Sequence, residues 1–163
     1  MIAFVSLTPR EAGQLQTLIR LNLESHKCFQ SAADRVDDAE LTALFYRHAR
    51  QHRAFAEELE RFVDPPDRAG EPGQATESAA PAIDPVHRGW QALRQRLVGD
   101  KVNWVLRFAE RVEREISMTY ETALRHPSRE DLVSVLERQR DEMAGAIQRI
   151  RSVHAARELR RAG

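Results

Sequence analysis

Apolar residues recur at intervals of three and four along several stretches of the chain, which is the spacing of one face of an α-helix. The clearest stretch covers residues 40–63, and its apolar positions are Leu41, Leu44, Phe45, Phe55, Leu59, Phe62 and Val63. At 100° per residue, His48 and His52 fall on the same face. The pattern therefore predicts a long helix with two histidines on its buried side.

A second long helix is predicted to precede this one. Thr8 and Glu11 form a capping box around Pro9, which marks the beginning of a helix. Its expected inward face is Leu15, Leu18, Ile19, Asn22, His26, Phe29, Ala33 and Val36. We expect Asp37 to cap the helix that follows, and the short connection makes the two helices an antiparallel hairpin.

Two more long helices are predicted in the second half of the chain. One ends at Pro127, and Ser128 is expected to cap the other. Their expected inward positions are Val105, Phe108, Ala109, Val112, Ile116, Tyr120 and Ala123 in the first, and Leu132, Leu136, Gln139, Met143, Ile147, Ile150 and His154 in the second.

The composition changes between the two pairs of helices. Five of the seven prolines fall within residues 64–85, which predicts a long crossover loop, and a short extra helix carrying Trp90 should follow it. Neither half has enough amphipathic helices to close a core alone, so we expect a single domain over residues 1–163. The predicted fold is an all-α, ferritin-like four-helix bundle, and the alternative is an up-down-up-down bundle with a slack loop.

The hairpin geometry predicts which polar residues meet inside the bundle. In an antiparallel pair, residues equally distant from the turn lie at one height. With the first turn centred near Asp37, His26 faces His48 and Asn22 faces His52. In the second hairpin, Glu113 and Gln139 lie about 20 Å from the turn, so polar residues of all four helices should form one layer at mid-height.

Such a layer has two interpretations. One is a metal site for zinc, iron or copper, with the candidate ligands His26, His48, His52 and Glu113. The other is a hydrogen-bonded polar layer, which includes Asn22 and Gln139, fixes the helix register and binds nothing. The Glu-x-x-His motif of carboxylate di-iron bundles is absent from the sequence, which argues against an oxidase centre.

Charge and cysteine content narrow the class of protein. The net charge is zero, which argues against nucleic-acid binding, and Cys28 is the only cysteine, which favours a reducing compartment. We find neither a signal peptide nor an apolar run of the ~18 residues that a membrane span requires. We therefore expect a cytoplasmic protein without membrane partners.

An ordered set of short motifs resembles a known family. The set is Phe29 with Ala32-Ala33, Leu44-Phe45, Phe55 with Glu58-Leu59, His87-Arg88-Gly89-Trp90, Glu113 and Tyr120-Glu121-Thr122-Ala123-Leu124. It is similar to the bacterial ferritin-like four-helix-bundle proteins of unknown function. The resemblance implies a ferritin-like fold and no established activity. The chain departs from the family pattern at Cys28 and Val112, where glycine is common, and at Ile147, where histidine often occurs.

These observations favour a non-enzymatic helical bundle that acts through self-association, as a homo-oligomer, or through a protein partner. A stress-associated role is an expectation by analogy. The alternative is a metal-binding bundle for transport, storage or oxidation at the His/Glu layer. A third hypothesis is a core sensitive to pH, because charging buried histidines is unfavourable.

Overall fold

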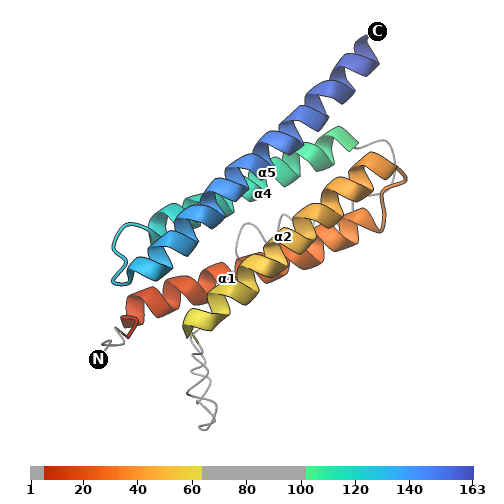
Figure 1. Ribbon diagram of the computed structural model, residues 1–163. Coiled ribbons are helices and arrows are strands. Elements are labelled where there is room, and N and C mark those ends of the chain that lie inside the picture. The colour runs from red at the N-terminus through yellow and green to blue at the C-terminus, as the bar shows by residue number, and fades with distance from the viewer. Residues whose placement is uncertain (1–5, 64–101) are drawn as a thin grey trace.

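The computed structural model describes residues 6–63 and 102–163 of the chain (Figure 1). These residues form four helices and no strand: α1 (Pro9–Ala33), α2 (Ala39–Val63), α4 (Val102–Ala123) and α5 (Glu130–Ala162). The prediction of an all-α fold is confirmed for these residues. The expected crossover loop at 64–85 and the short extra helix after it lie outside the described residues. None of the four helices is apolar enough over its length to span a membrane.

The helices form two antiparallel hairpins that lie side by side, α1 with α2 and α4 with α5 (Figure 1). Helix α1 packs against α4, and α2 packs against α5. Ser128, in the turn between α4 and α5, contacts Glu11 at the beginning of α1, and Arg157 near the end of α5 contacts Asp38 in the turn between α1 and α2. Helices α1 and α5 therefore run in one direction, and α2 and α4 run in the other.

Local capping sets where the first two helices begin. The Thr8 hydroxyl accepts a hydrogen bond from the Glu11 amide, which completes the predicted capping box. Helix α2 begins one residue later than expected, so Asp38 and not Asp37 provides the cap. Its Oδ1 accepts a hydrogen bond from the Leu41 amide at 3.0 Å.

Glu11 does more than cap α1, because it also ties the two hairpins together at one end of the bundle. Its Oε2 accepts hydrogen bonds from the Thr8 amide and hydroxyl, and its Oε1 accepts from the Ser128 amide and hydroxyl at 2.5 and 2.7 Å. Burial would raise the pKa of Glu11, but these hydrogen bonds outweigh it and lower the pKa to about 2. The prediction that Ser128 caps α5 was wrong, since Arg129 takes that position without a side-chain bond.

The core is a single apolar cluster that all four helices share. Its largest fully buried side chains are Tyr120, Phe29, Phe45, Leu15, Leu18, Leu41, Leu59, Leu106, Ile116, Leu132, Leu136 and Met143. Several predicted inward residues are only partly buried at its margin, namely Ile19, Val36, Phe62, Val63, Phe108 and His154.

Helix α5 is longer than its neighbours. It has 33 residues against 22 in α4, a difference of about 16 Å along the axis. Its C-terminal turns project past the other helices (Figure 1). Arg157 holds this projecting end to the bundle through ion pairs with Asp38 and Glu40.

Candidate functional site

The centre of the buried polar layer is the carboxylate of Glu113 on α4, which is 1% exposed. Two imidazoles from α2 contact the same oxygen of this carboxylate. His48 Nδ1 lies 2.7 Å from Glu113 Oε1, and His52 Nε2 lies 3.2 Å from it. Because α2 and α4 belong to different hairpins, this cluster joins the two halves of the bundle through charged and polar groups.

The histidines keep Glu113 ionised inside the core. Burial alone would raise the pKa of Glu113 by disfavouring its charge. The positive charge of His52 and the hydrogen bonds from His48 and His52 outweigh that effect and lower the pKa to about 2. An ionised carboxylate can only accept hydrogen bonds, so His48 Nδ1 and His52 Nε2 are the donors.

Asn22 on α1 determines the state of the other nitrogen of His52. Asn22 Nδ2 donates to the Leu18 carbonyl at 2.8 Å and to the Tyr120 hydroxyl at 2.9 Å, which fixes the orientation of the amide. Its Oδ1 therefore faces His52 Nδ1 at 2.8 Å, and an amide oxygen can only accept. Beside ionised Glu113, both ring nitrogens of His52 carry protons, and the imidazolium balances the buried carboxylate.

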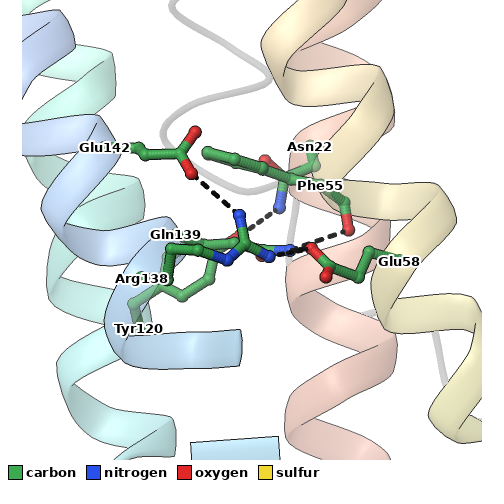
Figure 2. A network of polar contacts seen from close by, with 7 residues as sticks. All are labelled: Asn22, Phe55, Glu58, Tyr120, Arg138, Gln139 and Glu142. Carbon is green, nitrogen blue, oxygen red and sulfur yellow. Dashed lines mark hydrogen bonds and ion pairs between the residues drawn. The ribbon is translucent and has the colours of Figure 1, made fainter. Parts of the chain in front are cut away.

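From Asn22 the hydrogen bonds continue outward to the surface between α2 and α5 (Figure 2). The Tyr120 hydroxyl donates to Gln139 Oε1 at 2.8 Å, and Gln139 Nε2 donates to Glu58 Oε2 at 2.8 Å. Burial raises the pKa of Tyr120, which therefore remains a neutral donor. Every bond from His52 to Glu58 points the same way, from an imidazolium to a surface carboxylate, so each bond polarises the next.

The structure brings five of the six predicted polar residues into this layer. Asn22, His48, His52, Glu113 and Gln139 are all buried and hydrogen-bonded to one another directly or through Tyr120.

His26 stays outside the layer. It is partly exposed, and its Nδ1 lies 2.9 Å from the backbone oxygen of Ala49. His26 was predicted to face His48, but its ring is hydrogen-bonded to the Ala49 carbonyl instead. His26 follows Asn22 by four residues, which is about 40° more than one full turn of the helix. The His26 side chain is therefore rotated away from the direction in which Asn22 points.

Three members of the network were not predicted from the sequence. Tyr120 was placed on an inward face as an apolar residue, and its hydroxyl on that face is the signal that could have revealed its role. Glu58 is half-buried and Arg138 is exposed, so no burial pattern marks them. Their contact depends on how the two hairpins pack, which a single sequence does not reveal.

The cluster has one feature of a metal site and lacks others. A histidine that ligates a metal usually donates its second ring N–H to a carboxylate, as His48 does to Glu113. Among the described residues, His48 Nε2 and Glu113 Oε2 are buried without a hydrogen-bond partner. Nε2, however, lies on the side of the ring away from Glu113, so one ion could not bind both atoms in this arrangement. No group of three or more His, Cys, Asp or Glu side chains in the described ranges is placed to hold a metal.

In the described part of the chain, a surface cavity lies beside the outer end of the layer and not beside its buried ion pair. Three surface cavities have volumes of about 380, 550 and 690 Å³, and His48, His52 and Glu113 line none of them. The first lies between α2 and α5 and is lined by Glu58 and Arg138, among others. A molecule in that cavity would touch the surface end of the hydrogen-bonded chain and not the buried ion pair.

Comparison of the sequence with models of protein families assigns the chain to a family. The family model described as a domain of unknown function, DUF2383, matches residues 10–126. The chain belongs to the DUF2383 family. The DUF2383 match contains α1, α2 and α4, and therefore the whole His48–Glu113–His52 cluster, while α5 with Gln139 lies beyond it. No curated protein matches the chain in sequence.

Proposed function

We propose that this DUF2383 chain is a ferritin-like helical bundle that catalyses no reaction and acts by associating with a second copy of itself. The helix directions support the ferritin-like part. Helix α2 ends beside the beginning of α1, whereas α4 begins at the opposite end of the bundle, near the end of α5. One crossover between the hairpins, made by residues 64–85, is the connection that such a bundle uses.

The projecting end of α5 is the main evidence in favour of self-association. Ala155, Ala156, Leu159 and Ala162 are exposed there, at the spacing of one helical face. Leu159 is 76% exposed, the largest value among the large apolar side chains of the described residues. A helix end with an exposed apolar face gains stability when that face packs against another helix.

The burial of the polar layer supports a structural role for it and not a catalytic one. His48, His52 and Glu113 are at most 1% exposed, so a substrate has no surface of this cluster to touch. A buried, hydrogen-bonded ion pair favours one arrangement of helices, because any slip of register would leave charges unpaired. In this proposal the layer fixes how the hairpins meet and thus where the end of α5 projects.

Light scattering on the purified full chain tests the proposal. We expect the wild type to be a dimer or a larger oligomer and Leu159→Glu to be a monomer. Met118→Glu is the matched control, since Met118 is 65% exposed on α4 away from the projecting end, and it should leave the mass unchanged. A strictly monomeric wild type, or equal effects of the two substitutions, would contradict self-association through α5.

A metal-binding bundle is the second candidate, and the orientation of His48 by Glu113 favours it. We propose that any bound zinc, iron or copper would use His48 Nε2 together with ligands from outside this cluster. Elemental analysis of protein purified without an affinity tag tests this. Stoichiometric metal that disappears in His48→Ala but persists in His126→Ala, a change in the turn between α4 and α5, would favour it. Metal-free protein that does not bind added zinc would rule it out.

A further inference from the structure

The groove between α2 and α5 contains two arginines that face each other. The two helices run antiparallel, and Glu58 on α2 contacts Arg138 on α5. Arg47 lies eleven residues before Glu58, and Arg149 lies eleven residues after Arg138, so the two fall at the same height. Both line the groove of about 380 Å³, roughly 16 Å along it from the Glu58–Arg138 pair.

The two arginines differ from Arg138 in having no acidic partner. Arg138 lies between Glu58 and Glu142 (Figure 2). Its Nη1 is 2.8 Å from Glu142 Oε1. Neither Arg47 nor Arg149 pairs with an acid anywhere in the described chain, and Arg149 Nε is buried without a hydrogen-bond partner there. Two guanidinium groups facing each other without an anion repel, and a buried donor without an acceptor is costly.

On the α5 side, Gly145 lies beside the Arg149 side chain. A Cβ at this position would lie 3.5 Å from Nη1 of Arg149, so the guanidinium lies against the glycine. Farther along, Gln51, Ala54 and Phe55 line the groove on α2, and Glu142 lines it on α5. The groove thus offers two cations at one end and, on the α2 side beyond Gln51, the apolar surface of Ala54 and Phe55.

We propose that this groove binds a small organic monocarboxylate. The carboxylate lies between Arg47 and Arg149, whose planar forks match its two oxygens, and the apolar part of the ligand lies along Ala54 and Phe55. Three arginines and two glutamates line the groove, so its net charge is +1 and one negative charge neutralises it. A phosphate dianion would leave an excess negative charge near Glu142.

Binding in this groove would also stabilise the contact between the two hairpins. The ligand bridges α2 from the first hairpin and α5 from the second, next to the Glu58 carboxylate that accepts the Gln139 hydrogen bond. A ligand that binds only the folded state raises the unfolding temperature by mass action. We therefore expect the bundle to melt at a higher temperature when the groove is occupied.

The experiment is a titration of the full chain with sodium hexanoate at constant ionic strength, followed by two-dimensional NMR of the backbone amides. We expect saturable shifts at groove residues such as Ala54 and a higher melting temperature. Arg149→Gln and Arg47→Gln should each weaken binding at least tenfold. Arg53→Gln is the matched control, because Arg53 is exposed on α2 and pairs with Glu57 outside the groove.

Three results would overturn the inference. The first is the absence of saturable shifts in the wild type. The second is equal weakening by Arg53→Gln and Arg149→Gln, which would indicate only general attraction between charges. The third is inorganic phosphate binding in the groove as tightly as hexanoate. The Leu159→Glu variant should bind hexanoate normally, so failure of the self-association proposal would be distinguishable from failure of this one.

Discussion

Removal of one hydroxyl group, in Tyr120→Phe, tests how much the buried layer contributes to stability. The hydroxyl accepts a hydrogen bond from Asn22 Nδ2 at 2.9 Å and donates one to Gln139 Oε1 at 2.8 Å. Among the described residues, this hydroxyl is thus the only side-chain group that links the side-chain amide of Asn22 on α1 to that of Gln139 on α5. Phenylalanine keeps the aromatic ring and its edge contact with Phe55, so the substitution removes the two hydrogen bonds and little else.

The magnitude follows from the burial of the groups that remain. Asn22, Tyr120 and Gln139 are each 0% exposed, so water cannot replace the lost partners without entering the core. Each hydrogen bond contributes about 1 kcal/mol net, and a buried group left without a partner costs about 1–3 kcal/mol. Asn22 keeps its bond to the Leu18 carbonyl, whereas Gln139 Oε1 loses its donor. We therefore expect Tyr120→Phe to lower the free energy of unfolding by about 2–4 kcal/mol.

Urea denaturation followed by circular dichroism measures this change, with the midpoint falling and the m-value unchanged. The chain supplies its own control, because its other tyrosine, Tyr46, is 39% exposed and donates to Asp34 at the surface. Tyr46→Phe should change the free energy of unfolding by less than about 0.5 kcal/mol. A loss below about 0.5 kcal/mol for Tyr120→Phe, equal to that of the control, would refute the reasoning.

Three further predictions concern ionisation and helix formation. Glu113→Gln should destabilise the bundle by about 3 kcal/mol at neutral pH, because it leaves the His52 charge without its counter-ion. Because the pKa of Glu113 is lowered in the folded state, its ionised carboxylate stabilises the wild type above about pH 4.5, and this stabilisation is lost as the pH falls towards 2. Urea denaturation at stepped pH should therefore show the unfolding free energies of the wild type and Glu113→Gln converging in acid. Glu11→Gln should cost about 1–2 kcal/mol, since a neutral amide oxygen cannot hold both Thr8 and Ser128, and a lower melting temperature by circular dichroism would show it. Gly13→Ala should gain about 0.5–1 kcal/mol in urea denaturation, because a Cβ there meets nothing within 4 Å and alanine favours the helix; a loss would contradict the open, exposed position of Gly13.

The features that the sequence predicted well depend on local rules. The capping box of Thr8 and Glu11 involves residues three apart, and the periodicity of apolar positions follows from one helix at a time. The facing of Asn22 and His52 needed only the position of a short turn, and the structure places them 2.8 Å apart.

The features that were not predicted depend on how the two hairpins meet. Glu11 and Ser128 are separated by 117 residues, and their contact requires the axial position of one hairpin relative to the other. The contact of Glu58 with Gln139 has the same requirement. Periodicity identifies which face of a helix is buried but not the height at which two non-adjacent helices touch, so these contacts could not be derived from the pattern.

The buried polar layer couples the two hairpins. A double-mutant cycle between Asn22 on α1 and Tyr120 on α4, with Asn22→Ala, Tyr120→Phe and the double variant compared by urea denaturation, tests it most directly. We predict that the double variant loses at least about 1 kcal/mol less than the sum of the single losses, since each single change already breaks the shared hydrogen bond. Losses that add to within about 0.3 kcal/mol would show that the two residues do not interact and would contradict the claim.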